Sequence, residues 1–511
     1  MSALMSSSDD AKFLHYLVSI SGVVRTDRVL DVACGPGACT LAFAGRCRHA
    51  VGLDPSPDLI AEARTEAARA GARNAEFMAG EVERMGFRDC AFDAAVCRFA
   101  FHHFTNPARV FAEMARVVAP RGWMVVVDVT ASEDPARAAA HNELERLCDP
   151  THVRMLAASE FEPIFAAAGF TVAMKIARQS TSTVEEWTRF GDPPPENLPL
   201  IRAMLEDAVD DDRPGLALQR DAGTIRLMHT SVSFVLERSA RSPPDRGSEP
   251  MKDQDDNLTS VQRQFRRQAE AYSTMKVVTD PRILEQMVEI SEVRPDSRVL
   301  DVACGPGFVA MAFAPRCQDV LGIDATDTLV ARARAEAGRR GISNLRFALA
   351  NVERMPLASA RFDLATCRFA FHHFAHPRAV LAEMTRVLKP GGRMVIVDMT
   401  TCEDQAKSDY HNRLERLCDP SHARAIPVSE WERMIAETGL EAVYRGGRET
   451  SYDLESWMAH GGPPPDRRAQ IVEMMEASLA ADRSGLKVRR ENGQIWFSHT
   501  GVTYALEKPM R

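Results

Sequence analysis

The chain contains one sequence written twice. The nine residues from Val29 to Gly37 return unchanged as Val299 to Gly307, and the correspondence runs without a gap from about residue 28 to 238 at a constant offset of 270. An internal repeat has to be recognised before a fold is assigned, because each copy is a structural unit. The 511 residues therefore predict two domains of about 240 residues, each large enough to bury a hydrophobic core.

Composition predicts the boundary between the copies. Residues 239–258 are rich in proline, glycine and serine at first and in charged and amide side chains afterwards, as is typical of a linker. We expect a first domain at residues 1–238, a linker at 239–258 and a second domain at 259–511.

Charge and cysteine content exclude several classes of partner. The net charge of −8 comes with interspersed signs and no basic stripe, so we expect a small-molecule partner and no nucleic acid. No apolar run reaches the ~18 residues of a membrane span, and the first residues lack the pattern of a signal peptide, so a cytoplasmic location is expected. The eleven cysteines include no CxxC pair, which favours reduced thiols and no metal site.

Short apolar runs alternate with helical patterns inside each copy. The runs RVLDVAC, HAVGLD, FDAAVCRFA and WMVVVDV of the first copy have close equivalents in the second. Strands that are apolar throughout and separated by helices predict a parallel sheet covered on both faces, a doubly wound α/β domain. The runs TVAMKIA and TIRLMHTSVSFVLER are expected to close the sheet. Ser159 is expected to begin the helix that precedes the first of these runs, and Ser429 is expected to begin the equivalent helix of the second copy.

A glycine-rich turn follows the first predicted strand, and an acid ends the second. Gly35 lies in this turn and Asp54 follows it by 19 residues; Gly305 and Asp324 repeat the pair. Such a turn admits a cofactor close to the backbone, and the acid accepts hydrogen bonds from ribose hydroxyls. The pattern is shared with dinucleotide-binding folds, whose third glycine is replaced here by Thr40 or Ala310. In the alternative interpretation the glycines only turn the chain and the acids cap the next helix.

Five ordered motifs in each copy carry a more specific resemblance. LDVACGPG, GLD or GID, AGEVERM or LANVERMPL, FDAAVCRFAFHHF or its copy, and an AP-RG or KPGG turn occur in this order. The chain resembles the class I S-adenosylmethionine-dependent methyltransferases, in the branch of the ubiquinone/menaquinone C-methyltransferases. The resemblance implies a mostly parallel seven-stranded sheet, S-adenosylmethionine as cofactor and transfer of its methyl group to carbon or oxygen of a small molecule. It also implies cofactor contacts by Gly35, Gly37, Asp54, Glu81, Val82, Gly305, Gly307, Asp324, Asn351 and Val352.

The fourth predicted strand ends in a segment that both copies retain. Of residues 92–104, 11 of 13 are identical to their copies. Arg98 and Arg368 are expected to bind an anionic group of the substrate or to pair with a nearby acid. Adjacent helical side chains point about 100° apart, so the paired histidines that follow are not expected to face one substrate together.

A second retained segment follows the fifth predicted strand. Residues 141–152 match their copies at 10 of 12 positions. His141 and Glu145 share a helical face with two apolar residues, and in the resembling family this region covers the substrate, so His141 and His411 are predicted substrate contacts. His152 and His422 are the predicted general bases, because histidine titrates near neutrality; packing is the alternative.

The copies differ at their beginnings. Residues 261–272 resemble the family's helix that closes over the cofactor, and the first copy has no counterpart at the 270 offset. We therefore expect the second domain to be catalytic. The alternative is a cofactor-binding scaffold without turnover, in which the first domain is a built-in partner of an intramolecular pseudo-dimer.

Overall fold

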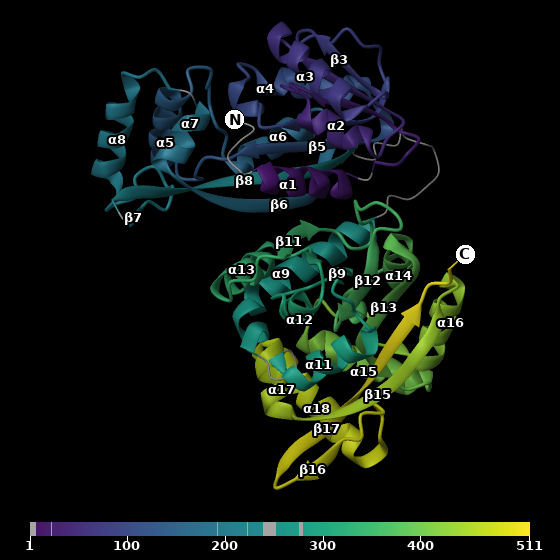
Figure 1. The fold of residues 1–511 in the computed structure, drawn as a ribbon. Helices are drawn as coiled ribbons and strands as arrows, with labels where there is room; N and C mark the ends of the chain where they lie inside the picture. The colour runs from purple at the N-terminus through teal and green to yellow at the C-terminus, as the bar shows by residue number, and fades with distance from the viewer. Residues whose placement is uncertain are drawn as a thin grey trace. The chain divides into compact units, whose positions relative to one another are not determined.

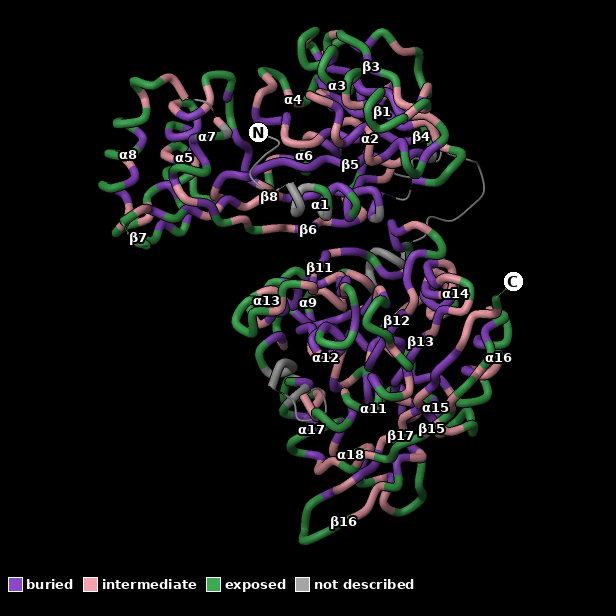
Figure 2. The backbone as a smooth tube through the Cα atoms, in the orientation of Figure 1, coloured by how far each residue is buried: buried purple, intermediate pink, exposed green. Residues whose placement is uncertain are grey.

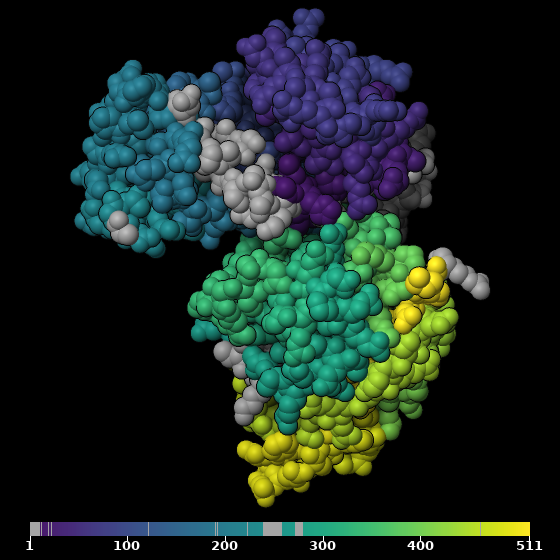
Figure 3. Space-filling model, viewed as in Figure 1, coloured from purple at the N-terminus to yellow at the C-terminus, as the bar shows by residue number. Residues whose placement is uncertain are grey.

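The computed structural model describes residues 7–21, 23–191, 193–221, 223–238, 252–274 and 279–510. The chain divides into two compact units, with the main boundary between residues 244 and 245. The first unit is coloured purple to teal-blue and the second teal-green to yellow (Figures 1 and 3). Residues 239–251 of the predicted linker lie outside the described residues. Its last part belongs to helix α9 (Lys252–Thr274), which begins before the predicted domain start at 259, because charged and amide residues are also compatible with a helix.

Seven strands form the main sheet of the first unit, in the order β3-β2-β1-β4-β5-β8-β6. All neighbours are parallel except β8, which is antiparallel to both β5 and β6. A short strand, β7, forms a hairpin with the start of β8. The strands are β1 (Arg28–Val32), β2 (His49–Asp54), β3 (Ala75–Ala79), β4 (Phe92–Arg98), β5 (Val118–Val129), β6 (Phe170–Thr183), β7 (Gln219–Asp221) and β8 (Thr224–Arg238). The helices are α1 (Ser7–Ile20), α2 (Ala38–Ala44), α3 (Pro57–Ala70), η1 (Phe101–His103), α4 (Pro107–Val117), α5 (Pro135–Cys148), α6 (Ala158–Ala167), α7 (Val184–Gly191) and α8 (Asn197–Ala208).

The second unit repeats this topology in the order β11-β10-β9-β12-β13-β17-β15, with β17 antiparallel to both neighbours. Two short strands, β14 and β16, pair with β13 and β17. The strands are β9 (Arg298–Val302), β10 (Asp319–Asp324), β11 (Leu345–Ala350), β12 (Phe362–Arg368), β13 (Leu388–Thr401), β14 (Ile426–Pro427), β15 (Glu441–Asp453), β16 (Arg489–Glu491) and β17 (Gln494–Glu507). The helices besides α9 are α11 (Pro281–Ser291), α12 (Phe308–Phe313), η2 (Ala314–Arg316), α13 (Asp327–Arg339), η3 (Phe371–His373), α14 (Pro377–Val387), α15 (Gln405–Cys418), α16 (Val428–Thr438), α17 (Leu454–Gly461) and α18 (Pro465–Ala481).

Helices cover both faces of each sheet, which confirms the predicted doubly wound fold. In the first unit α4 and α6 pack their aromatic residues on one face, and α3 packs on the other around Phe77. In the second unit α11, α12 and α13 share one apolar cluster with β9 and β13. The central strands are buried along almost their whole length (Figure 2). The predicted starts of α6 and α16 are wrong by two residues. Ala157 and Pro427 are the N-caps, and the hydroxyls of Ser159 and Ser429 donate to Glu133 and Glu403 instead.

The last two long strands of each unit extend beyond the sheet and carry a second layer of helices. In the second unit α15, α17, α18 and the far end of β17 enclose a separate apolar cluster around Phe497 and Met475. The first unit has the same cluster among α5, α7, α8 and β8. In this layer, which we call the roof, α15 packs on α18, and α5 packs on α8 in the first unit.

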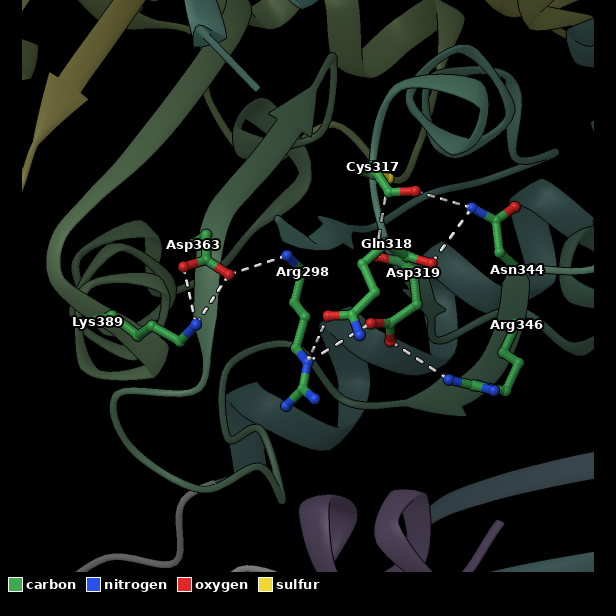
Figure 4. Close-up of polar contacts among 8 residues, drawn as sticks. All are labelled: Arg298, Cys317, Gln318, Asp319, Asn344, Arg346, Asp363 and Lys389. Carbon is green, nitrogen blue, oxygen red and sulfur yellow. Dashed lines mark hydrogen bonds and ion pairs between the residues drawn. The ribbon is translucent and has the colours of Figure 1, made fainter. Parts of the chain in front are cut away.

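The amino ends of the strands are tied by polar side chains (Figure 4). Asp363 accepts hydrogen bonds from the backbone N–H of Arg298 at 2.9 Å and from Lys389 Nζ at 2.8 Å, and so joins β12 to its two neighbours. Asn344 donates to the carbonyls of Ala314 and Cys317. Ala119 of the first unit stands in the place of Lys389, so the first unit lacks this ion pair. Within the described residues, no helix is long and apolar enough to cross a lipid bilayer.

The glycine that begins α12 is expected to be irreplaceable. Gly307 has φ of +82°, and a Cβ atom there would lie 2.5 Å from Phe347 Cζ, whereas Gly341 has φ of +66° and open space around it. Both alanine variants incur the left-handed backbone cost, but only Gly307→Ala also overpacks the core, at about 1–3 kcal/mol. Denaturant unfolding of the full-length variants followed by circular dichroism should show Gly307→Ala to be the less stable by this margin. Equal destabilisation would contradict the predicted clash.

Candidate functional site

One carboxylate organises the carboxyl edge of the second sheet. Asp324 ends β10, and its Oδ2 accepts a hydrogen bond from the Gly305 N–H at 2.8 Å. Its Oδ1 accepts from the Thr326 N–H, also at 2.8 Å. Asp324 therefore fixes the loop after β9 and the start of α13 together. A carboxylate has roughly four lone-pair sites, so acceptor capacity remains after these two bonds.

The first unit repeats this arrangement. Asp54 accepts from the backbone N–H groups of Gly35 and Ser56, each at 2.9 Å. The N-cap residues of α3 and α13 are Ser56 and Thr326. Asp54 and Asp324 thus bind the backbone of the N-cap residue but are not N-caps themselves. The alternative interpretation, in which these acids cap the next helix, is therefore only partly correct.

Four of the five residues predicted to bind the cofactor in the second domain line a cavity of about 80 Å³ at this edge. Its lining includes Gly305, Asp324, Asn351 and Val352. Gly307 is not among the lining residues, and a Cβ atom at this position would meet the ring of Phe347. A direct cofactor contact by Gly307, or by its copy Gly37, stays a prediction. Cofactor contacts by Glu81, which is exposed, and Val82, which is buried, also stay predictions.

Helix α9 covers this cavity. Its residues Leu258, Val261 and Phe265 line the cavity wall. Gln262 Nε2 donates to the Ala325 carbonyl at 2.9 Å, and Arg266 pairs with Asp327 at 2.9 Å. The first described helix of the other unit, α1, aligns with α11 at the 270 offset. Among the described residues, α9 therefore has no counterpart in the first unit.

A larger cavity of about 220 Å³ adjoins the first. Phe265, Phe369 and His373 line both cavities and form their common wall. Most of the remaining wall is apolar or aromatic and includes Met287, Tyr444 and Trp457. A small molecule in the larger cavity would therefore lie directly beside a ligand in the smaller one. The polar side chains of the larger cavity include three histidines and the carboxylates of Glu415 and Asp419, together with Arg448, two glutamines and three threonines.

His372 lies in this wall with one ring nitrogen held by an acid. Its Nδ1 is 2.6 Å from Asp398 Oδ1, and Asp398 Oδ2 also accepts from the Phe371 N–H at 2.7 Å. Burial alone would lower the pKa of His372, but the charge and hydrogen bond of Asp398 outweigh it and the pKa is raised. His102 and Asp128 repeat the pair at 2.5 Å. Such a pair leaves Nε2 available toward a substrate.

The prediction that adjacent histidines face apart is wrong. His372 and His373 both line the larger cavity, with ring centres 4.2 Å apart. They lie in a three-residue 3-10 turn directly after the strand, so the spacing of an α-helix does not apply. His373 Nδ1 lies 3.1 Å from the Ser421 carbonyl, and its ring packs on Phe265.

The structure does not support His422 and His152 as general bases. His422 is buried and is absent from the lining of both cavities. Its Nε2 lies 2.8 Å from Asn412 Oδ1, and burial holds its pKa well below the usual value. His152 makes the same contact with Asn142 at 2.8 Å. These histidines fix the turns after α15 and α5. Their position in the sequence, next to the roof helix, did not reveal that their rings are buried.

His411 instead belongs to a buried cluster of three side chains. Its Nε2 lies 3.3 Å from Glu415 Oε1, and His499 Nε2 lies 2.9 Å from the same oxygen. Glu415 and His499 line the larger cavity, whereas His411 lies behind them. Burial would raise the pKa of Glu415, but the two imidazoles outweigh it and hold the pKa well below its usual range. His141, Glu145 and His229 form the same cluster in the first unit.

Sequence reasoning found two members of this cluster and missed the third. The i,i+4 spacing placed His411 and Glu415 on one helical face, as observed. His499 comes from β17, 84 residues after Glu415, and sequence spacing does not relate them. Its retention as His229 in the first copy was the available signal.

Arg98 and Arg368, the last residues of β4 and β12, take a structural position. Arg368 is buried, lies over the Phe369 ring at 5.3 Å and is absent from the lining of both cavities. Burial raises the pKa of Asp301 to about 7, against the lowering effects of Thr366 and the Arg368 charge. Arg98 acts in the same way on Asp31. The structure thus favours pairing with a nearby acid over binding of a substrate anion.

Comparison with known proteins relates both units to one family. A model described as "Methyltransferase domain" matches residues 30–126 and 300–396. The methyltransferase YcgJ of Bacillus subtilis, whose own description calls it uncharacterized, is 37% identical over 233 residues, 45% of this chain and 91% of the relative. The crystal structure of YcgJ is 33% identical over 45% of this chain and 99% of its own, with a TM-score of 0.43.

A second relative is the ubiquinone/menaquinone biosynthesis C-methyltransferase UbiE of Pseudomonas putida. It is 36% identical over 157 residues, which is 30% of this chain and 61% of the relative. The match thus spans less than two thirds of that enzyme.

Removal of the Asp324 carboxylate should weaken cofactor binding. Asp324→Ala loses a charge-assisted contact and loosens the Gly305 loop, so the dissociation constant of S-adenosylmethionine at the second-domain site should rise roughly 10- to 150-fold. Isothermal titration calorimetry of the full-length chain measures it. Asp363→Ala, which removes a carboxylate at the opposite end of the strands, is the control. An unchanged dissociation constant in folded Asp324→Ala would rule out the ribose contact.

Helix α9 should contribute through its apolar face. Phe265→Ala removes a buried ring from the cavity wall and should raise the same dissociation constant by roughly tenfold or more. Arg266→Ala removes only an exposed ion pair of the same helix, worth about 0–1 kcal/mol, and should change it little. Equal effects of the two variants would mean that α9 does not act by apolar closure.

Proposed function

Because the chain belongs to the class I S-adenosylmethionine-dependent methyltransferases, we propose that its second domain methylates a small-molecule acceptor bound in the 220 Å³ cavity. The observation that carries the proposal is the common wall of Phe265, Phe369 and His373 between the two cavities. Methyl transfer needs donor and acceptor side by side in a site that excludes water.

The residues of the smaller cavity fit the cofactor. Asp324 offers unused acceptor capacity for ribose hydroxyls, Gly305 presents backbone, and Val352 offers an apolar surface beside Asn351. These four residues would hold S-adenosylmethionine, and the cofactor supplies a methyl group that is already activated by its sulfonium. Phe265 and Val261 of α9 exclude water from the same cavity.

His372 is the general base of this proposal. Asp398 holds Nδ1 of the ring, which leaves Nε2 to take a proton from the acceptor and would stabilise the imidazolium that then forms. A base is required when the acceptor is a hydroxyl or an acidic carbon, which agrees with C- or O-methylation. The name of the UbiE relative, a C-methyltransferase of quinone biosynthesis, favours a ring-bearing acceptor.

The first domain is proposed to bind the cofactor more weakly. It retains the Asp54 and Gly35 hydrogen bond, but no described element corresponds to α9. A purely cofactor-binding scaffold is the competing function, and turnover decides between them.

Loss of His372 should reduce turnover far more than cofactor affinity. His372→Gln should lower kcat by about 10²–10⁴-fold while the dissociation constant of S-adenosylmethionine changes less than threefold. The assay follows S-adenosylhomocysteine formation with a panel of phenols, catechols and hydroxyquinones. His102→Gln, the matched change in the first domain, should leave kcat within about twofold.

A larger loss in His102→Gln than in His372→Gln would move catalysis to the first domain. Absence of turnover with every acceptor, despite tight cofactor binding, would favour the scaffold.

A further inference from the structure

We propose that His411, Glu415 and His499 form a binding site for a divalent first-row transition-metal ion at the wall of the acceptor cavity, and that His141, Glu145 and His229 form its copy in the first domain. Each residue offers one donor atom, and the three donor atoms of each cluster lie within 4.8 Å of one another. The proposal rests on the proposed function only in taking the larger cavity to be the site that binds the acceptor.

The spacing of the donors fits an ion. Zinc–nitrogen and zinc–oxygen distances of about 2.0–2.2 Å place neighbouring ligand atoms roughly 3–3.5 Å apart. Glu415 Oε1 lies 3.3 Å from His411 Nε2 and 2.9 Å from His499 Nε2. Two imidazoles and one carboxylate are a ligand set used by zinc and by non-heme iron.

The three donor atoms are buried and none of them makes a hydrogen bond. His411 Nε2, Glu415 Oε1 and His499 Nε2 approach one another closely, but their angles do not satisfy a hydrogen bond. The side chains of His411 and Glu415 are only 1% and 9% exposed. Buried polar atoms are normally hydrogen-bonded, so three convergent atoms that are not indicate a ligand among them.

The local structure orients the ligands. His411 and Glu415 are four residues apart on α15 and so project from one helical face, while His499 faces them from β17. His411 Nδ1 lies 3.1 Å from Thr401 Oγ1. A ligating histidine commonly donates its other ring N–H in this way, which fixes the tautomer and directs Nε2 to the metal.

The position of the cluster indicates what the ion would bind. Glu415 and His499 belong to the cavity wall, so an ion held by three protein ligands would keep an open coordination position toward the acceptor. That position suits an oxygen donor such as a hydroxyl, enol or catechol group. The cysteine pattern that predicts no metal site does not bear on this cluster, because its donors are imidazole and carboxylate.

The copies differ in one supporting residue. Ala131 stands in the first domain where Thr401 orients His411. His229 Nε2 also lies within hydrogen-bond distance of Glu145 Oε1, at 3.0 Å, whereas His141 Nε2 makes no hydrogen bond. The first-domain site should therefore bind the ion more weakly than the second.

Metal titration of the full-length chain tests the proposal. The protein is stripped with chelator and titrated with cobalt(II), whose d–d absorption reports coordination, and then with zinc(II) as a competitor. We expect two sites per chain and displacement of cobalt by zinc. Glu415→Gln and His499→Gln should each abolish the tighter site, and Glu145→Gln the weaker. His422→Gln, which changes a buried histidine beside α15 that is no ligand, should retain both.

Thr401→Ala keeps all three ligands and should weaken metal binding at the tighter site about 10- to 100-fold. This variant tests the site even if circular dichroism shows that a ligand variant is unfolded. A stripped chain that binds neither cobalt nor zinc at micromolar concentration overturns the proposal, as does binding that the Glu415, His499 and Thr401 variants leave unchanged. Metal binding without methyl transfer would refute the proposed function and leave the metal site standing.

Discussion

The Asp324 carboxylate is the constraint on which the rest of the site depends. By binding the Gly305 and Thr326 amides it joins the loops after two adjacent parallel strands. The chain that leaves it presents the Ala325 carbonyl and Asp327, and these are the groups to which Gln262 and Arg266 of α9 attach. The docked helix then places Phe265 between the two cavities. A local pair of backbone hydrogen bonds thus determines how the cofactor cavity is closed.

The acceptor side depends on a different element, the antiparallel strand β17 inserted between β13 and β15. Because β17 runs past the sheet, it reaches the roof and brings His499 opposite α15. The end of β13 supplies Thr401 to the same place. One inserted strand therefore connects the rigid sheet to the side chains that would meet an acceptor, and residues far apart in sequence converge within a few ångströms.

How well the sequence predicted each part of this site depends on how far apart in the sequence the interacting residues lie. The Gly305 and Asp324 pair was predictable because each lies directly after an apolar strand, and parallel strands end at one edge. His411 and Glu415 were predictable from helical spacing. His499 was not, since its partnership with Glu415 depends on the pairing of β17. His422 was misassigned because a pattern shows where a residue lies along the chain and does not show that Asn412 and a buried turn enclose its ring.

The duplication provides a physical test of which features matter. The first domain has Ala119 in place of Lys389 and no described counterpart of α9, yet it keeps His141, Glu145 and His229. Replacement of a whole buried ionic cluster by apolar residues of similar volume is often neutral or stabilising, whereas removal of one member alone is strongly destabilising. Loss of Glu145 alone would leave the buried His141 and His229 without their common partner. The cluster is kept although the first domain has no described counterpart of α9, so its retention does not depend on cofactor closure, which agrees with a site that binds its own ligand.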